Sequence, residues 1–454
     1  MPSSSAGATT EYWNRADVVA RLTFTPASGT ITSGGSLVLQ AQGFDAYNFA
    51  LGDVTKATKF TVAGNPCVGA TCSPTDVGDH VVTGTNGAAT GTVTMHVLVA
   101  GAPGSKSYGW GDNEFGQLGD GTTTDRSAPV QIGLDTHWAS VAAGGGHSVA
   151  IKTDGTLWAQ GDNQFGQLGD GTLTDRSIAV QVGTDTHWAS VTAGSDQTLA
   201  VKDDGTLWAW GSNDSGQLGD GSTTDRSVPV KVGNGTTWAS VASGYAHTVA
   251  VTTDHTAWTW GRNDEGELGD GTTSGTPRLT PVRLGSAADW ASVSAGDLDT
   301  VAVKTDNTLW AWGENSDGQL GDGTLTPRST PVPVGVGTAW ASASAGSYSA
   351  LALDTAGHLW SWGNNDFGQL GLGAVGDTKV PTQVGGTTWS YVSSNFEHTV
   401  AVTSGGTLWS WGDNEVGQLG DGTTTDRNAP VQVGTAITWA RVAAGEGFTV
   451  ALRP

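Results

Sequence analysis

Histidine is the side chain best suited to acid–base chemistry near neutral pH, and it recurs in this 454-residue sequence at His147, His247 and His398. The same place in four other repeats holds another residue: Gln197, Asp299, Ser349 and Phe448. A metal or catalytic site needs such groups to converge with a carboxylate, and the sequence has no His-x-x-x-His spacing. We therefore expect this position to hydrogen-bond between strands or blades, and we predict no catalytic residue and no metal ligand.

Two further motifs resemble ligand loops. Leu-Gly-Asp-Gly-Thr at residues 118–122 gathers oxygen atoms, but it lacks the alternating Asp/Asn ligands and terminal Glu of an EF-hand loop. A glycine-rich turn capped by the aspartate is the better interpretation. Gly-Ala-Pro-Gly-Ser-Lys-Ser at residues 101–107 lacks the glycine before lysine and the strand-to-helix context of a phosphate loop. We interpret it as a linker and expect no cofactor.

The only two cysteines are Cys67 and Cys72, which lie in Asn-Pro-Cys-Val-Gly-Ala-Thr-Cys. Two ligands alone cannot close a zinc site, so this spacing favours a local disulfide across a loop. A disulfide indicates an oxidising, extracytoplasmic location, either secreted or at the cell surface.

Recognition chemistry is concentrated in seven residue pairs that differ between otherwise similar repeats. The pairs follow a recurring Ala-Gly or similar dipeptide: Gly145-Gly146, Ser195-Asp196, Tyr245-Ala246, Asp297-Leu298, Ser347-Tyr348, Phe396-Glu397 and Glu446-Gly447. Unconstrained drift is the alternative explanation, but drift favours small polar residues. Three aromatic residues among fourteen positions expected to be exposed favour binding, with Tyr245, Tyr348 and Phe396 as anchors. The candidate partner-binding residues are Ser195, Asp196, Tyr245, Asp297, Leu298, Tyr348, Phe396, Glu397 and Glu446.

A second variable set precedes Gly-Gln-Leu-Gly in each repeat: Phe115, Phe165, Ser215, Glu265, Asp317, Phe367 and Val416. A contact at the rim of the binding surface is possible for these side chains. Packing beneath the turn is the favoured interpretation.

The repeats that must position these residues are visible directly. Gly-Gln-Leu-Gly or a near copy begins at Gly116, Gly166, Gly216, Gly266, Gly318, Gly368 and Gly417, so successive copies are 50, 50, 50, 52, 50 and 49 residues apart. Units of this length exceed the common helical solenoid repeats, and each contains several short β-type runs separated by Gly and Asp. We predict seven blades of a β-propeller over residues 103–454.

Turn and core residues fit this assignment. Asp154-Gly155 stands between two strand-like runs and predicts a tight hairpin, whereas Asp254-His255 and Asp306-Asn307 depart from the Asp-Gly pattern. A first tryptophan series opens one strand of each unit, at Trp138, Trp188, Trp238, Trp290, Trp340, Trp389 and Trp439. A second occupies Trp158, Trp208, Trp258, Trp310, Trp360 and Trp409. We expect both series to fill the wedge between neighbouring blades.

The ends of the repeat region predict how the ring closes. The chain stops at residue 454, where Asp-Gly-Thr-Leu-Trp-Ala-Trp-Gly should follow, and the missing strand is found at residues 106–111 with Tyr108 in the place of Trp208. The first and last segments should then share one blade, which removes two exposed sheet edges. Residues 1–102 carry none of the repeat and alternate at period two, so we predict a small immunoglobulin-like β-sandwich followed by a linker.

Charge narrows the classes of partner. The formal net charge is −23, and residues 101–454 hold 37 acidic and 16 basic residues. An acidic surface repels phosphate backbones and anionic lipids, so nucleic acid and membrane insertion are not expected. A protein or peptide partner is expected, a basic one fitting best, and the chain is expected to be a monomer.

Trp210-Gly-Ser-Asn-Asp-Ser-Gly-Gln-Leu-Gly219 and Ser243-Gly-Tyr-Ala-His-Thr-Val-Ala250 resemble the repeat of the regulator of chromosome condensation family. The resemblance implies a seven-bladed propeller over residues 107–454. Gly-Asp-Val-Thr at residues 52–55 is similar to bacterial immunoglobulin-like modules of surface proteins.

The eukaryotic founder of the family exchanges nucleotide on a Ran-type GTPase through an inserted wedge, and the repeats here leave no room for such an insertion. A relative with this fold is secreted by bacteria and inhibits β-lactamases through loop residues on one face. We therefore favour a non-enzymatic protein-binding propeller, for example an inhibitor or an adhesion module of a bacterial secreted or surface protein. A nucleotide-exchange factor or enzyme using the channel mouth, and a purely structural surface module, are the alternatives.

Overall fold

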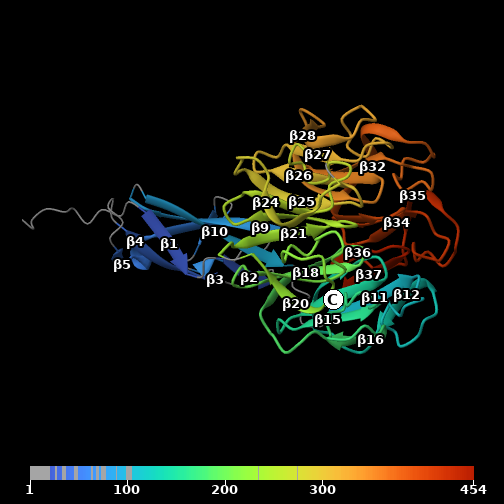
Figure 1. The fold of residues 1–454 in the computed structure, drawn as a ribbon, viewed down its shortest axis with the longest axis horizontal. Coiled ribbons are helices and arrows are strands. Elements are labelled where there is room, and N and C mark those ends of the chain that lie inside the picture. The colour runs from blue at the N-terminus through green and yellow to red at the C-terminus, as the bar shows by residue number, and fades with distance from the viewer. Residues whose placement is uncertain are drawn as a thin grey trace, which may run out of the picture. The chain divides into compact units, whose positions relative to one another are not determined.

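The computed structural model describes residues 21–25, 28–32, 37–44, 50–62, 65–67, 71–72, 78–87, 89–98, 105–233, 235–273 and 275–454. The chain forms two compact units, Met1–Val97 and Leu98–Pro454. Nearly all regular structure in both units is β-strand (Figure 1). Within the described ranges, no helix has the length and apolarity needed to cross a membrane.

The described residues of the first unit form three groupings of strands. One sheet holds β1 (Arg21–Thr25), β4 (Gln40–Phe44) and β5 (Ala50–Asp53). A second holds β2 (Ser28–Thr32), β10 (Ala89–Leu98), β9 (Gly78–Asn86), β6 (Lys59–Val62) and β7 (Asn65–Pro66), and β3 (Leu37–Val38) pairs with β8 (Thr71–Cys72). The short 3₁₀ helix η1 (Thr55–Ala57) follows β5. Leu22 and Phe24 of the first sheet share a buried core with Phe60 and Val82 of the second.

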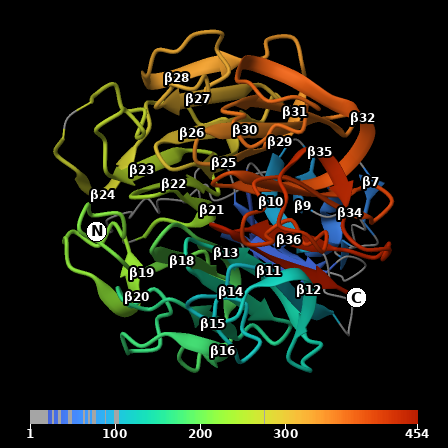
Figure 2. The same ribbon diagram turned by 90° about the vertical axis from the view of Figure 1, so that its right-hand side faces the viewer.

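The second unit is a seven-bladed β-propeller, which confirms the predicted fold class. Figure 2 shows the blades following one another around a common axis, from β11 and β12 through to β34, β35 and β36, which return beside them. Each blade is a four-stranded antiparallel meander, numbered 1 to 7 from the blade of β13 to the blade of β36.

The first strands of the blades lie innermost. They are β13 (Trp138–Ala143), β17 (Trp188–Ala193), β21 (Trp238–Ser243), β25 (Trp290–Ala295), β29 (Trp340–Ala345), the second half of β32 (Thr378–Asn395) and β36 (Arg441–Ala444). The second strands are β14 (His147–Lys152), β18 (Gln197–Lys202), β22 (His247–Thr252), β26 (Asp299–Lys304), β30 (Ser349–Asp354), β33 (His398–Thr403) and β37 (Phe448–Arg453).

The third strands are β15 (Leu157–Gly161), β19 (Leu207–Gly211), β23 (Ala257–Gly261), β27 (Leu309–Gly313), β31 (His358–Gly363), β34 (Leu408–Gly412) and β11 (Lys106–Gly111). The outer strands are β16 (Arg176–Gln181), β20 (Arg226–Val232), β24 (Arg278–Arg283), β28 (Arg328–Val334), the first half of β32, β35 (Arg427–Gln432) and β12 (Arg126–Ile132). Strand β32 is therefore shared: it ends blade 5 and begins blade 6.

Blade 7 joins the two ends of the propeller chain. Its strand order is β12-β11-β37-β36, and Tyr108 of β11 lies opposite Ala451 of β37. The Trp110 indole donates a hydrogen bond to the Gln418 carbonyl oxygen at 2.9 Å, across the boundary with blade 6. The strand from the beginning of the repeat region thus completes the last blade and leaves no open ring.

Tryptophans fill the spaces between blades. Indoles of the first predicted series are buried, and Trp188 packs edge-on against Trp208 with ring centroids 6.3 Å apart. A third series that the sequence analysis did not single out is the most deeply buried, with 0% exposure: Trp110, Trp210, Trp260, Trp312, Trp362 and Trp411. The Trp210 Nε1 donates to the Gln167 carbonyl oxygen of the preceding blade at 2.9 Å. This indole also packs on Gly169, where an added Cβ would meet Nε1 at 2.6 Å.

The hairpins without Asp-Gly adopt the same turn. His255 and Asn307 both have positive φ, 63° and 65°, in the place where Gly155 has φ 77°. A non-glycine residue is strained in the left-handed backbone region, and His255 and Asn307 adopt it because a tight hairpin turn requires it.

Candidate functional site: the loop face of the propeller

The loops between the first and second strands form a ring around the axis, and their backbones hydrogen-bond from one blade to the next. Gly145 N donates to Ser195 O at 2.9 Å, and Tyr245 N donates to Asp297 O at 3.3 Å. Glu446 N of blade 7 donates to Gly144 O of blade 1 at 3.1 Å, which joins the last blade to the first. We call the seven variable pairs on this ring the inner circle.

The inner circle is held from below by the first residue of each second strand. His147, His247 and His398 reach the next blade through Nε2, which lies 2.9 to 3.0 Å from the hydroxyl of Thr198, Thr300 or Thr449. Burial lowers the pKa of His147 to about 4, so these imidazoles are neutral. The expectation that this position hydrogen-bonds between blades holds for the three histidines and for Gln197, but not for Asp299 and Ser349, whose side-chain oxygens have no hydrogen-bond partner in the described part of the chain, nor for the apolar Phe448.

A second set of residues surrounds the inner circle. In each blade the residue after the third strand donates its backbone N–H to the carbonyl oxygen of the second residue of the variable pair, at 2.8 to 3.0 Å. We call this set the outer circle: Asp112, Asp162, Ser212, Arg262, Glu314, Asn364 and Asp413. The loop after the first strand and the loop after the third strand of a meander lie at the same end. Both circles therefore belong to one face, which we call the loop face.

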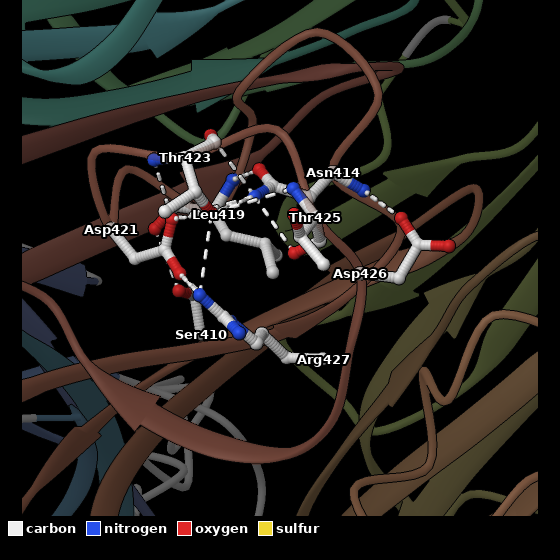
Figure 3. Close-up of polar contacts among 8 residues, drawn as sticks. All are labelled: Ser410, Asn414, Leu419, Asp421, Thr423, Thr425, Asp426 and Arg427. Atoms are coloured by element: carbon white, nitrogen blue, oxygen red, sulfur yellow. Dashed lines mark hydrogen bonds and ion pairs between the residues drawn. The ribbon is translucent and has the colours of Figure 1, made fainter.

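The outer circle begins a long loop that a repeated polar network makes rigid. In blade 6, Asn414 Nδ2 donates to the carbonyl oxygens of Thr423 and Thr425 at 3.1 Å, while Asp426 accepts from Asn414 N at 3.0 Å (Figure 3). Asp421 accepts from Arg427 and from Thr423 Oγ1 at 2.6 Å. The Leu-Gly-Asp-Gly-Thr turn is therefore an aspartate-capped turn with its carboxylate paired, as interpreted from the sequence.

Exposure separates the predicted site residues into two groups. Tyr245 is 50% exposed and Tyr348 is 38% exposed, and Glu446 is also exposed. Six others are half-buried: Ser195, Asp196, Asp297, Leu298, Phe396 and Glu397. The expectation that all fourteen positions are exposed is wrong, since Ala246 and Ser347 are buried. In blade 3, Tyr245 N donates to Asp297 O of the next blade at 3.3 Å and Ala246 O accepts from Arg262 N at 2.9 Å, so this pair is held against its neighbours.

Phe396 needs a special backbone. Its φ is 47°, in the left-handed region, and its N–H donates to Asn395 Oδ1 at 2.9 Å. A bulky residue in this region is strained unless the surroundings hold it. Phe396 is also half-buried, whereas Tyr245 and Tyr348 are more exposed.

Carboxylates crowd the loop face and act on one another. Burial, with the charges of Asp162 and Asp214, raises the pKa of Asp196 to about 6. Burial, with Asp413 and Asp366, raises the pKa of Glu397 to about 7. Burial also raises the pKa of Glu446, and the charges of Asp297 and Asp196 on other blades add to this effect. Carboxylates on different blades therefore raise one another's pKa values across the loop face.

The sequence analysis missed the outer circle. Its acidic members Asp112, Asp162, Glu314 and Asp413 follow the invariant glycine of the third strand, where the residue type varies between repeats. This variation between repeats is the sequence signal from which the outer circle could have been predicted. The second variable set, with Phe115 and Asp317 among its members, is half-buried next to these loops.

Cys67, the predicted disulfide residue in the first unit, is disulfide-bonded, and Cys72 is the only other cysteine in the sequence. The Cys67 N–H donates to Phe60 O at 2.9 Å. In the described part of the chain no group of three or more His, Cys, Asp and Glu side chains could hold a metal ion.

Comparison with known proteins places the propeller among characterised folds. The RCC1-like domain profile matches residues 106–451. Yeast RCC1 (Prp20), in a crystal structure with Kap60, is 22% identical over 78% of this chain and 89% of its own, with a TM-score of 0.70. Saccharomyces cerevisiae Prp20p, from a study of its binding to Gsp1p and histones, gives 22% identity, 78% and 93% coverage and a TM-score of 0.70. Human WBSCR16 gives 22% identity, 77% and 98% coverage and a TM-score of 0.69.

Proposed function

This chain belongs to the RCC1-like domain family, and from that membership we propose that it is a non-enzymatic propeller whose loop face binds a protein or peptide partner. The observation that carries the proposal is the pair of exposed tyrosines, Tyr245 and Tyr348, on a rigid ring crowded with carboxylates. Rigid aromatic side chains lose little conformational entropy on binding and are frequent hot spots of interfaces.

The charge of the face favours a basic partner. Glu397 and Glu446 of the inner circle stand near the outer-circle carboxylates Asp413 and Asp112. Lysines such as Lys152 and Lys202 instead pair with Asp135 and Asp185, at the end where the outer strands lead to the next blade. Positive charge on the partner would therefore meet a complementary face, which increases association rates and orients the complex.

The relatives support protein binding as the general role, since yeast RCC1 was crystallised with Kap60 and Prp20p was studied for binding to Gsp1p and histones. Within this role, an inhibitor of a secreted enzyme or an adhesion module of a bacterial surface protein is the version we propose. The disulfide at Cys67 supports an extracytoplasmic location. We propose that the first unit is an immunoglobulin-like spacer, and its core shared between two sheets supports this.

Affinity capture followed by titration calorimetry tests the loop face. A partner captured by the wild-type chain should bind the triple variant Tyr245→Ala, Tyr348→Ala, Phe396→Ala at least about tenfold more weakly, as expected for loss of hot-spot aromatics. The matched control is Leu134→Ala, Val336→Ala, Ile437→Ala, which removes exposed apolar side chains from connections at the opposite end of the blades.

If both triple variants bind the partner as tightly as the wild type, the loop face is not the binding surface. Stimulation of nucleotide release from a Ran-type GTPase by the wild-type chain would instead favour an exchange factor. Thermal melting of each variant shows that a loss of binding does not come from unfolding.

A further inference from the structure

Carboxyl groups gather in two parts of the loop face, and the loops of blades 6 and 7 hold one group of six: Glu397, Asp413, Glu415, Glu446, Asp112 and Glu114. The other group is next to Tyr348. It lies in the loops of blades 3 and 4 and also has six members: Glu265, Glu267, Asp297, Asp299, Glu314 and Asp317. We call this group the acidic sector. Within the described residues of these loops, Arg262 is the basic side chain, and it lies 2.7 Å from Asp264 and 3.7 Å from Glu267. One guanidinium cannot neutralise six carboxyl groups, so the sector is short of positive charge.

The pKa values show the same imbalance. Burial raises the pKa of Asp297 and of Glu267, even though Arg262 acts to lower the latter. Burial and the adjoining Glu314 carboxyl raise the pKa of Glu265. Burial disfavours the charged form of each group, and at Glu265 the neighbouring carboxyl groups add to this effect.

Asp299 is a second, independent observation in the acidic sector. It is 0% exposed, and neither carboxylate oxygen has a hydrogen-bond partner among the described residues. Its Oδ1 lies against the backbone of Gly296, 2.4 Å from where an added Cβ would stand. Gly296 directly precedes Asp297 in the inner circle. Burial and then the charges of Asp297 and Glu314 raise its pKa well above the usual range. A buried carboxyl group without a partner is costly to ionise, and a strongly perturbed pKa at such a position marks a candidate functional site.

Blade 5 places an aromatic ring beside this sector. Tyr348 is 38% exposed, and burial together with the charges of Asp297 and Asp317 raises the pKa of its hydroxyl. Asn364 links Tyr348 to the sector, because its N–H donates to Tyr348 O at 2.9 Å and its Nδ2 donates to Asp317 Oδ1 at 3.3 Å. Carboxylates beside an aromatic face bind an ammonium or guanidinium group through ion pairing and cation–π attraction.

We infer that the acidic sector, with Tyr348, is the sub-site that receives a lysine or arginine side chain of the partner. The inference rests on the proposed function and specifies where on the loop face the positive charge of the partner is bound. A side chain is favoured over a metal ion because the described residues contain no group of three or more ligands that could hold a metal.

Peptide binding tests the sub-site separately from capture of a native partner. The probe is a fluorescein-labelled peptide of alternating glycine and arginine, and its control carries uncharged citrulline at each arginine. In fluorescence anisotropy at about 0.15 M salt, the wild-type chain should bind the arginine peptide about tenfold more tightly. The variant Asp297→Asn, Glu314→Gln should lose about tenfold. The matched variant Asp214→Asn, Asp366→Asn removes the same charge from loops of blades 2 and 5 and should lose less than about threefold.

Each alternative result overturns the sub-site. Equal losses in the two double variants would mean that general attraction to the face explains binding. Equal binding of the citrulline peptide, or no binding of the arginine peptide, would exclude cation recognition. Displacement by 1 mM calcium chloride, but not by sodium chloride of the same ionic strength, would assign the sector to a metal ion. The proposed function stands in all these cases if the aromatic triple variant still loses the native partner.

Asp299→Asn supplies a readout that a structural role would not produce. Removing a buried unpaired charge should raise thermal stability at pH 8, while the arginine peptide should bind about threefold or more weakly than to the wild type. Unchanged peptide affinity together with higher stability would remove Asp299 from the sub-site, and lower stability would contradict its unpaired state.

Discussion

At the scale of single residues, one position of the repeat shows how this ring is held and where it departs from its own rule. The first residue of the second strand joins adjacent blades in several ways. His147 contacts Thr198, and Gln197 donates to Gly244 O at 2.8 Å and to Ser243 Oγ at 2.7 Å. Asp299 fills the same position, but the residue one blade on is Ala350, which has no hydroxyl group. The bond between blades is therefore absent, and the Asp299 carboxyl group is buried without a hydrogen-bond partner among the residues that the structure describes.

The first residue-scale prediction concerns Asp299→Asn. The folded-state pKa of Asp299 lies above its unfolded value, so the wild-type chain loses stability as the pH rises above about 4. The isosteric amide has no charge to bury and could donate to the ring carbonyls. We expect the variant to be more stable than the wild type by about 1–3 kcal/mol at pH 8 in urea denaturation. The difference should shrink at pH 5, and an equal or negative difference at both pH values would contradict the prediction.

At the scale of elements, a tryptophan on the third strand of each blade hydrogen-bonds to the preceding blade, with one exception. Trp260 and Trp312 donate from Nε1 to the carbonyl oxygens of Gln217 and Glu267 at 2.9 Å. In blade 1 the equivalent residue is Gln160, whose Nε2 reaches the Gln117 carbonyl oxygen at 3.3 Å. A small cavity lies at this seam between blades 7 and 1, lined by Ser107, Ile132, Trp138, Trp158 and Gln160 among others.

This cavity makes Gln160→Trp a test of the blade packing. An indole should fill the space, restore the hydrogen bond to Gln117 O and pack on Gly119, as Trp210 does on Gly169. We expect a gain of about 1 kcal/mol, typical of cavity-filling changes, and a higher melting temperature. The reverse change Trp260→Gln is the control and should lose about 3 kcal/mol or more. A destabilised Gln160→Trp variant would show that the seam is already tightly packed.

Elements were predicted more completely from the sequence than the site was. The spacing of Gly-Gln-Leu-Gly and the recurring tryptophans were enough to predict the propeller. Each glycine and each indole makes an equivalent contact in most blades, so the same residue types recur at the same spacing. Exposure of the inner circle could not be predicted, since it depends on which neighbouring carbonyl oxygen each loop N–H meets. Asp299 was visible as a departure from His147, but its lost partner Ala350 is 51 residues away and becomes its neighbour only when the ring forms.

At the scale of the whole molecule, carboxyl groups at the two ends of the blades differ in their surroundings. At one end, the Lys202 ammonium hydrogen-bonds to Asp185 and lowers the pKa of that carboxyl to about 2. On the loop face, burial and like charges raise the pKa of Asp196 to about 6 and of Glu397 to about 7. Asp185 and these two loop-face carboxyl groups therefore respond to pH in opposite directions.

The sign of each contribution predicts the pH of greatest stability. Asp185 stabilises the folded chain above its unfolded pKa near 3.8, and this contribution is lost as the pH falls toward 2. Asp196 and Glu397 bind protons more tightly when folded, so stability is fully present below about pH 4 and is lost as the pH rises through 6 and 7. We expect the melting temperature, measured by calorimetry at constant ionic strength, to peak between about pH 4 and 5. In the variant Asp196→Asn, Glu397→Gln the decline from pH 4.5 to 7.5 should be shallower. An unchanged slope would show that these two carboxyl groups do not destabilise the loop face.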